Sequence, residues 1–149
     1  MINNYSIINK NGRVNVFLFW DSECPLCANY ERDIKVYKEQ FKKDSIFFYK
    51  VYCNEFDFEK AIDRDQNIIL DSSKNLVKAL NGIVTPQAFA VSPEGEILYS
   101  GKIDNWIVSL GQKRQIVDSF YLKDALLAVI NDKEIKISTT TPVGCFIER

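Results

Sequence analysis

The amino-acid sequence predicts an α/β fold, and three observations lead to that prediction. Residues 14–20 are apolar apart from Asn15, which is typical of a central parallel strand that helices cover on both faces. A helical stripe and a second apolar run follow, so a βαβ unit is expected. A hairpin pattern and a last amphipathic stretch come later. With 149 residues, 46% of them hydrophobic, we expect one core and a single domain over residues 1–149.

Periodicity defines the βαβ unit. The first strand is predicted from Val14 to Trp20 and the second from Ser45 to Cys53. Between them a helix is predicted from Pro25 to about Lys42, because apolar residues recur at helical spacing. These residues are Cys27, Tyr30, Ile34, Tyr37 and Phe41.

The second half continues with shorter elements. A helix is predicted from Phe56 to Asp65, and a short apolar stretch, Ile68 to Leu70, follows it. Ser72 or Ser73 can cap a further helix that stops at Gly82, a favoured residue after a helix end. Its apolar positions are Leu76, Val77 and Leu80.

A β-hairpin, a loop, a helix and a tail complete the pattern. Residues 87–91 and 96–100 flank Ser92-Pro93-Glu94-Gly95, which suits a type I turn. Periodicity disappears over residues 102–118, so a long loop is expected there. Leu122, Ala125, Leu126 and Val129 predict a last amphipathic helix. In the tail, residues 132–149, the alternation of Ile135, Ile137 and Thr139 to Thr141 favours an edge strand before Pro142 and Cys145.

Composition excludes several classes of function. The 19 basic and 20 acidic residues nearly cancel and gather on no segment, so nucleic acid is not an expected partner. The longest apolar runs are strand-length, so no membrane span is expected. The chain holds no histidine, which excludes Cys-His and Ser-His pairs, imidazole metal ligands and a histidine base. With no charged and then apolar leader after Met1, it fits either a cytosolic protein or an envelope protein trimmed of its export signal.

Cys24-Pro25-Leu26-Cys27 is the motif that carries chemistry. Two thiols at this spacing, between a strand and a helix, can close and reopen a disulfide. Cys24 precedes the first helical turn, where free N–H groups and the helix dipole stabilise a thiolate, so it is the expected attacking sulfur. Cys27 lies on the apolar stripe and is the expected resolving sulfur, more buried than Cys24. A zinc site would need a second pair of ligands at matching spacing, which is missing, and no cofactor is predicted.

The order of elements and four short motifs resemble the thioredoxin superfamily over residues 5–131. Phe19-Trp20 resembles the aromatic pair before that family's active site, and Cys24 to Cys27 matches its redox motif. Thr85-Pro86 resembles its Thr-Pro before the third strand, and Gly101 its glycine after the hairpin. The loop and the ending, residues 142–147, look like the redoxin branch, grouped with the alkyl hydroperoxide reductase and thiol-specific antioxidant proteins. The resemblance implies a three-layer α/β/α fold with a mixed central sheet and a C-terminal extension.

The resemblance also implies a substrate-positioning site and shows two departures. A cis Thr85-Pro86 bond would lie against the dithiol and offer backbone to an extended partner peptide, with Pro25 and Leu26 as the intervening pair. Leu18 stands where many thioredoxins have a buried carboxylate, and Glu23 replaces an aromatic residue. Glu23 is either a proton relay or, more commonly for such a position, a solvated acid whose charge opposes thiolate formation at Cys24. Trp20 is expected in the core.

Cys53 and Cys145 are candidate auxiliary thiols. Cys53 ends a strand whose carboxyl end should lie on the same rim as Cys24, and burial is the commonest fate of a lone cysteine. A Cys53–Cys145 disulfide, or a shuttle from Cys145 to the dithiol, requires Cα atoms within about 7 Å.

Three functions remain open at this stage. The leading one is a thiol–disulfide oxidoreductase that acts on disulfide-containing or dithiol protein partners through Cys24 and Cys27. A thiol peroxidase is the second, although the proline and threonine of that family correspond here to Phe17 and Asp21. The third is a non-catalytic partner or Cu(I)-binding module, for which Trp106, Lys113 and Arg114 in the 102–118 loop offer a surface.

Overall fold

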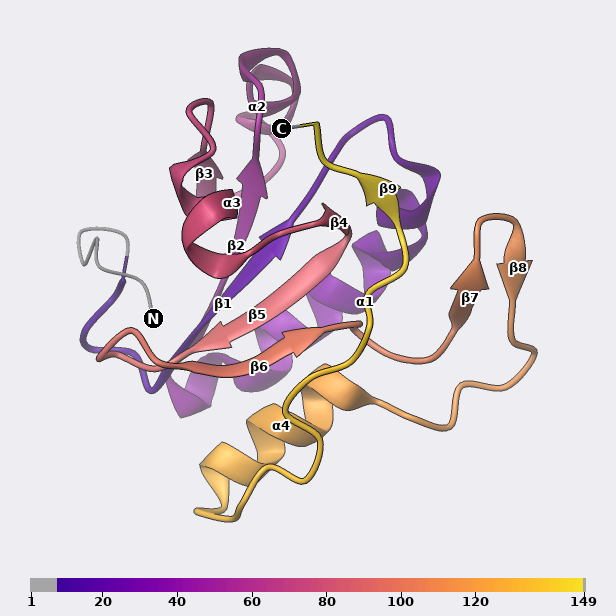
Figure 1. Cartoon of the computed structure of the whole chain (residues 1–149). Coiled ribbons are helices and arrows are strands. Elements are labelled where there is room, and N and C mark those ends of the chain that lie inside the picture. Colours follow the sequence, from indigo (N-terminus) through magenta and orange to yellow (C-terminus); the bar gives the residue numbers. More distant parts are fainter. Residues whose placement is uncertain (1–7, 149) are drawn as a thin grey trace.

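A mixed five-stranded sheet forms the centre of the molecule (Figure 1), as the computed structural model describes it for residues 8–148. The strand order is β3-β2-β1-β5-β6. β1 and β3 both run parallel to β2, whereas β5 is antiparallel to β1 and to β6. The strands span Val14–Phe19 (β1), Ile46–Tyr52 (β2), Ile68–Leu70 (β3), Gln87–Val91 (β5) and Ile97–Gly101 (β6). The predicted α/β fold with a mixed sheet is confirmed.

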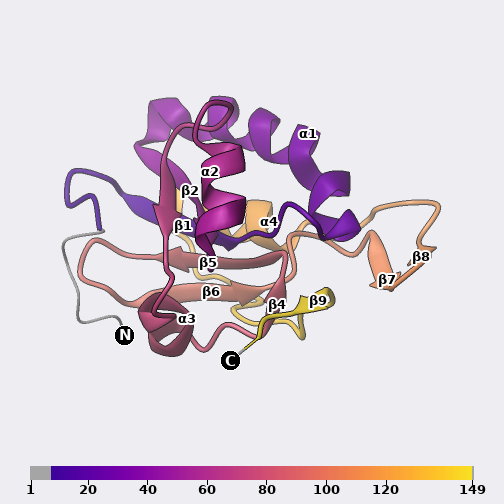
Figure 2. The same ribbon diagram turned by 90° about the horizontal axis from the view of Figure 1, so that it is seen from above.

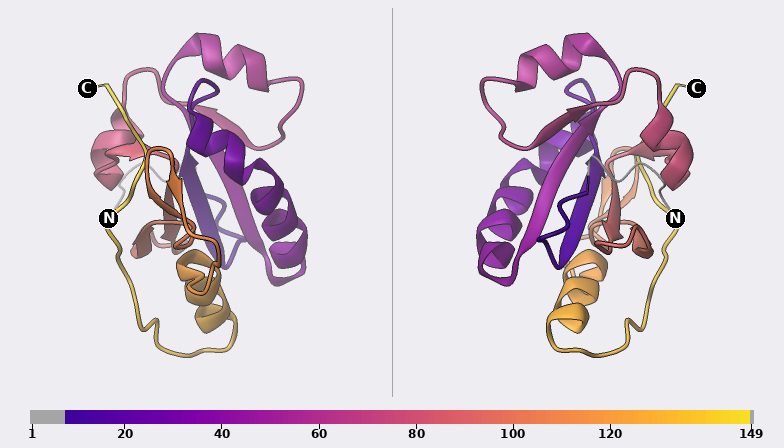
Figure 3. Two further views of the ribbon diagram at one scale, coloured as in Figure 1. Left: turned by 90° about the vertical axis from the view of Figure 1, so that its right-hand side faces the viewer. Right: turned by 90° about the vertical axis from the view of Figure 1, so that its left-hand side faces the viewer.

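Helices cover both faces of this sheet and make the three predicted layers. Figure 3 shows α1 (Pro25–Phe41) and α4 (Tyr121–Ile130) on one face and α3 (Asn75–Leu80) on the other. α2 (Glu55–Ala61) follows β2 at the carboxyl end of the parallel strands (Figure 2). The remaining elements are the 3-10 turn η2 (Lys42–Asp44) and the short strands β4 (Val84–Thr85), β7 (Ile107–Ser109), β8 (Gln112–Lys113) and β9 (Cys145–Phe146). Over residues 8–148, no helix is long and apolar enough to cross a bilayer.

Strand β1 is buried along its whole length because its side chains pack into the core on both faces of the sheet. Val16 and Leu18 pack into the cluster that includes α1 and α4, whereas Phe17 and Phe19 pack into the cluster that includes α3. The apolar stripe of α1 faces the sheet as its spacing predicts, and α1 ends one residue before the predicted Lys42. These contacts fix the position of the α1 N-terminus relative to the end of β1.

The short helices differ from the prediction at their ends. α3 is not capped by Ser72 or Ser73: the Asp71 carboxylate accepts hydrogen bonds from the backbone N–H groups of Leu76 and Val77, at 3.0 and 2.9 Å. At its other end Asn81, with φ 58°, takes the left-handed conformation that was expected of Gly82. α2 begins at an Asn54 cap and ends at Ala61 rather than Asp65, because the last residues turn Asp65 toward a buried cation described below.

The segments after β5 keep their predicted type with two additions. The Ser92-Pro93-Glu94-Gly95 turn joins β5 and β6, and Ser92 Oγ accepts from Glu96 N at 3.0 Å. The 102–118 loop contains the β7–β8 hairpin, whose period is too short to be recognised in the sequence. The predicted edge strand of the tail is reduced to one bridge between Ser100 and Thr139, and the paired strand lies later, at β9.

Gly82 offers a test of the packing beside β1. A Cβ at this position would lie 2.8 Å from Cε2 of Phe19, a ring that is fully buried. Gly82→Ala is therefore expected to lower the free energy of unfolding by about 1–3 kcal/mol in urea denaturation. Asn81→Gly is the matched control, because glycine tolerates a φ of 58°, and should change it by less than about 0.5 kcal/mol. Equal effects of the two changes would contradict this reading of the contact.

Candidate functional site

The turn from β1 into α1 places Cys24 at the helix N-terminus. Trp20 N donates to Val51 O at 2.9 Å, which carries the sheet pairing one residue beyond β1, and Cys24 N donates to Asp21 O at 3.2 Å. Cys24 is the N-cap residue, Pro25 is at the first helical position, and Cys24 O accepts from Cys27 N at 3.1 Å. The strand, turn and helix predicted around the motif are all present, with Leu26 and Cys27 buried in the first turn.

Cys24 is joined by a disulfide to Cys145, and not to Cys27. The Cα atoms of Cys24 and Cys145 are 6.3 Å apart, whereas Cys27 and Cys53 are free thiols. A pairing of Cys53 with Cys145, one of the two alternatives left open by the sequence, is thus wrong for this state. The other alternative, a shuttle from Cys145 to the dithiol, stays a prediction, and the disulfide between Cys145 and Cys24 is compatible with it. Sequence alone could not decide this, because the two cysteines are 121 residues apart.

The tail reaches Cys24 by pairing with the segment before Pro86. The Thr85–Pro86 bond is cis, as predicted, and Thr85 O lies 3.4 Å from Cys24 Sγ. β9 lies antiparallel to β4, with Cys145 opposite Thr85, and Figure 1 shows the yellow tail crossing to β4. Ile147 N extends the pairing by donating to Ile83 O at 2.9 Å.

The tail changes the expected exposure of the two motif cysteines. Cys24 is only 3% exposed and Cys27 is 1% exposed. The predicted contrast, with Cys24 facing partners and Cys27 buried, is therefore absent in this state. The cause is local, since Cys145 is joined to Cys24 and its strand β9 pairs with β4 beside it.

Cys27 lies in an environment that holds its thiol protonated. Burial raises the pKa of Cys27 to about 12, and the negative charges of Asp21 and Glu31 act in the same direction. The Asp21 backbone N–H and the Thr85 hydroxyl, which can donate to a thiolate, lower this pKa in part. Within residues 8–148 the Thr85 hydroxyl oxygen is buried and makes no hydrogen bond in this state. A hydroxyl donor without an acceptor thus lies beside the Cys27 thiol.

A pair of carboxylates, Asp21 and Asp57, borders the dithiol. Ser22 Oγ and Asn54 Nδ2 donate to Asp57, the latter at 2.9 Å. These bonds outweigh burial and lower the pKa of Asp57, whereas burial and the Asp57 charge raise the pKa of Asp21. Asp57 is therefore the more acidic carboxyl group of the pair, and Asp21 is the more basic one. This pair could not be recognised in the sequence, because the two residues are far apart in the chain and lie on a turn and on α2.

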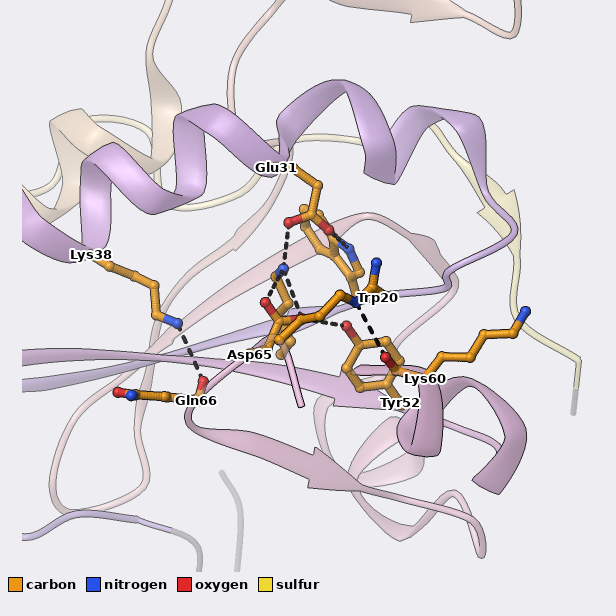
Figure 4. A network of polar contacts seen from close by, with 9 residues as sticks. Trp20, Glu31, Lys38, Tyr52, Lys60, Asp65 and Gln66 are labelled. Carbon is orange, nitrogen blue, oxygen red and sulfur yellow. Dashed lines mark hydrogen bonds and ion pairs between the residues drawn. The ribbon is translucent and has the colours of Figure 1, made fainter. Parts of the chain in front are cut away.

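A buried cation lies behind the site, on the α1 side of the sheet (Figure 4). Lys50 Nζ pairs with Glu31 at 2.6 Å and with Asp65 at 3.3 Å, and it lies 4.8 Å from the centre of the Trp20 ring. Trp20 Nε1 donates to Glu31 at 2.8 Å, and Trp20 is buried as expected. In the sheet register Lys50 is opposite Leu18, the residue that stands where many thioredoxins have a buried carboxylate. Here α1 supplies the carboxylate, as Glu31.

The remaining predicted residues lie around this centre. Glu23 is exposed and forms an ion pair with Lys60 at 2.7 Å, which fits a solvated acid. Cys53 lines a cleft of about 320 Å³ together with Asp21, Asp57 and Thr85, and burial raises its pKa to about 11.

In the 102–118 loop, Trp106 packs edge-on against Tyr30 and carries Lys113 over its ring, while Arg114 pairs with Asp118 at 3.6 Å. The described part of the chain contains no group of three or more His, Cys, Asp or Glu residues placed to hold a metal ion.

Comparisons with known proteins agree with this architecture. A hypothetical protein from Sinorhizobium meliloti 1021 has a similar structure, with a TM-score of 0.75 at 20% identity over 93% of this chain and 80% of that one. A thiol:disulfide interchange protein from a Bacteroides species gives a TM-score of 0.52 at 24% identity, covering 61% and 65% of the two chains. A thiol-disulfide oxidoreductase from Bacteroides fragilis NCTC 9343 gives 0.50 at 21% identity, covering 59% and 71%. No functionally curated protein matches the chain.

The family model for the thioredoxin-like domain matches residues 3–105, which include β1, the Cys24 to Cys27 motif and the cis proline. Because this match covers more than half of the chain, and the sheet and helices have the corresponding arrangement, the protein belongs to the thioredoxin-like family.

Proposed function

We propose that the protein is a thiol–disulfide oxidoreductase in which Cys24 attacks and Cys27 resolves. One observation carries this proposal: Cys24, at the N-terminus of a 17-residue helix, is joined to a cysteine of an extended segment that pairs beside the cis proline. This is the arrangement that a mixed disulfide with a protein partner requires. The names of two structural relatives, an interchange protein and an oxidoreductase, agree with it.

The proposed exchange has two steps. The Cys24 thiolate, stabilised by the free N–H groups and dipole of α1, attacks one sulfur of a partner disulfide, and the other partner sulfur leaves as a thiolate. The Cys27 thiolate then attacks Cys24 Sγ, which releases the second partner sulfur and leaves a Cys24–Cys27 disulfide. Two electrons have passed to the partner, whose two sulfurs are now thiols.

The buried Cys27 must lose its proton in the second step. Asp21 is the proposed acceptor, because burial and the charge of Asp57 raise its pKa and its backbone N–H lies where it can stabilise the thiolate. The Thr85 hydroxyl is a second proposed donor to that thiolate, and it has no competing hydrogen bond. Pro25 and Leu26 set the first turn between the two sulfurs, and Pro86 positions the partner strand.

Reduction of insulin disulfides by dithiothreitol, with and without the protein, tests the proposal. The wild-type chain is expected to accelerate the reduction, and Cys24→Ser is expected to lower the rate to the uncatalysed background. The double variant Cys27→Ser, Cys145→Ser lacks both cysteines that can displace a partner from Cys24, so its reduced form, mixed with insulin in the absence of dithiothreitol, should stall as a covalent Cys24–insulin adduct that is visible on a non-reducing gel. Cys53→Ala is the control, because Cys53 lies outside the dithiol motif and forms no disulfide, and should keep the wild-type rate. Full activity of Cys24→Ser would refute the proposal.

The same variants also test the thiol peroxidase alternative. Hydrogen peroxide replaces insulin in that assay, and consumption of peroxide by a chain that retains Cys24 alone would favour a peroxidase. The position that would carry the peroxidase proline is Phe17, which is fully buried within β1 and stacks on Tyr49 at 5.6 Å between ring centres. We therefore expect that a chain retaining Cys24 alone does not accelerate the consumption of hydrogen peroxide.

A further inference from the structure

The segment around Cys145 lies along the backbone that precedes the cis proline. Residues 143–147 run antiparallel to the segment before Pro86, with the backbone of Cys145 opposite Thr85 and that of Ile147 bonded to Ile83. Side chains alternate as in a bound strand: Cys145 and Ile147 are partly buried, whereas Phe146 is 84% exposed. Val143 packs on the core cluster of α1 and Ile147 on that of α3. The tail thus contacts both sides of the site.

Gly144 shows how closely this segment approaches β4. A Cβ at Gly144 would overlap the carbonyl oxygen of Thr85 and would lie 3.3 Å from the Pro86 nitrogen. Only glycine allows the two backbones to come this near while Cys145 meets Cys24. The absence of a side chain at Gly144 therefore allows the tail to fit against the backbone of Thr85 and Pro86.

The tail is also anchored a few residues before Cys145. Thr140 N donates to Ser100 O at 3.0 Å, and the Thr140 hydroxyl contacts Tyr99 OH and Lys102 N, both at 2.8 Å. Only four residues, 141–144, separate this anchor from Cys145, so the Cα atom of Cys145 can lie at most about 17 Å from that of Thr140. Cys145 therefore stays near Cys24 even when the disulfide opens, at a high effective concentration.

We propose that residues 142–148 are an internal substrate, whose Cys145 alternates with Cys27 as the disulfide partner of Cys24 and whose backbone competes with protein partners for the segment before Pro86. This inference rests on the proposed thiol–disulfide exchange and adds its regulation. In the exchange the Cys27 thiolate attacks Cys24 Sγ, the Cys24–Cys145 bond breaks, and its electron pair leaves on Cys145. The proton lost by Cys27 balances the one gained by Cys145, so no external oxidant or reductant is consumed. The closed state, with Cys24–Cys145, excludes partners, and the open state, with Cys24–Cys27, admits them.

Disulfide mapping of the full chain tests the proposal, with Cys53→Ala in every variant to prevent scrambling. The oxidised protein is quenched in acid, alkylated and mapped by mass spectrometry. We expect both Cys24–Cys145 and Cys24–Cys27 in the parent chain, only Cys24–Cys145 in Cys27→Ser, and only Cys24–Cys27 in Cys145→Ser. Gly144→Ala should lower the ratio of Cys24–Cys145 to Cys24–Cys27 at least tenfold.

Two threonines give a matched pair for the anchor. Thr140→Val removes the hydroxyl that contacts Tyr99 and Lys102 and should lower the same ratio several-fold, with more rapid insulin reduction as the site opens. Thr139→Val, the same change at the preceding and more exposed position, should leave the ratio unchanged.

The outcomes separate the two proposals. Absence of Cys24–Cys145 in the parent and in Cys27→Ser, or equal ratios in Gly144→Ala and the parent, overturns the internal substrate. If insulin reduction through Cys24 and Cys27 continues in that case, the proposed function still holds. If neither disulfide forms and insulin reduction does not depend on Cys24, both proposals fail.

Discussion

Between pH 7 and pH 10, the rate at which Cys27 displaces Cys145 from Cys24 is expected to rise about tenfold per pH unit, or about 1000-fold in all. The attacking species is the Cys27 thiolate, and burial raises the pKa of this thiol to about 12. Over the whole range the thiolate is a minor species, so its fraction increases tenfold with each unit of pH. A cysteine with an ordinary pKa would instead reach a plateau near pH 9.

The rate can be measured by starting from one isomer. The Cys24–Cys145 form in the Cys53→Ala chain is isolated at pH 4, where exchange is frozen, and is transferred to each final pH. Acid quenching and chromatographic separation then give the fraction of Cys24–Cys27 with time. A rate that is independent of pH, or that levels off below pH 9, would contradict the environment described for Cys27.

Thr85→Val tests the same environment, because it should lower the rate of the exchange while it raises the stability of the folded protein. Loss of the hydroxyl removes a donor to the Cys27 thiolate, so the exchange should be about three- to tenfold slower at every pH, with the same slope. The folded protein, however, should gain about 1 kcal/mol of stability, because a buried hydroxyl without a hydrogen bond is replaced by a methyl group. A merely disruptive substitution would lower both the rate and the stability.

The raised pKa of Cys27 also links stability to pH. The folded protein holds this proton more tightly than the unfolded chain, whose thiol titrates near its ordinary value of 9.0. The contribution is therefore fully present below about pH 9 and is lost as the pH rises toward about 12. Urea midpoints of the Cys24–Cys145 form, compared with those of Cys27→Ser, should diverge in this alkaline window and not below it.

Local patterns were enough to predict the strands β1, β2, β5 and β6 and the start of α1, whereas the mixed order of the sheet came from the family resemblance. The nearly unbroken apolar run of β1 and the helical spacing of the α1 stripe are short-range patterns, and the Cys24 to Cys27 motif lies between them. The cis bond at Thr85-Pro86 was accessible only through the family resemblance. Assignment to the redoxin branch stays a prediction, since the match is to thioredoxin-like domains in general.

The tertiary partners of the site could not be predicted in the same way. Cys145 meets Cys24 through a pairing of two-residue strands, β4 and β9, which are too short to leave a periodic signal. Asp57 and Asp71 were missed because a carboxylate that bonds to a turn or to helix N–H groups resembles a surface acid in sequence. In the sequence Glu31 looks like a solvent-exposed residue of a helix. Its ion pair with Lys50 becomes visible only when α1 is packed on the sheet.

Lys50→Met is expected to lower the free energy of unfolding by about 3 kcal/mol, or about 150-fold in the folding equilibrium. The Lys50 side chain is 5% exposed and faces Asp65, which is 14% exposed, so its removal leaves a poorly hydrated carboxylate without a cation. The loss should stay at the lower end of the range for buried pairs, because the second partner, Glu31, is 41% exposed and can be hydrated. Urea denaturation measures the effect.

Two further variants decide whether charge, and not packing, causes this loss. Lys35→Met makes the same substitution on the exposed surface of α1 and should change stability by less than about 0.5 kcal/mol. Glu31→Gln, added to Lys50→Met, removes one unpaired charge and should recover part of the loss, whereas alone it breaks an ion pair and should destabilise.

The rate at which Cys27 displaces Cys145 from Cys24 can be measured in the same variants as a second, independent test. The charge of Glu31 raises the pKa of Cys27, so without Lys50 to offset it the attack of Cys27 should be slower, and Glu31→Gln should restore it. If Lys50→Met destabilises the chain but leaves the exchange rate unchanged, the cation supports the sheet alone. If both change together and Glu31→Gln reverses both, one buried charge couples the stability of the fold to the chemistry of the dithiol.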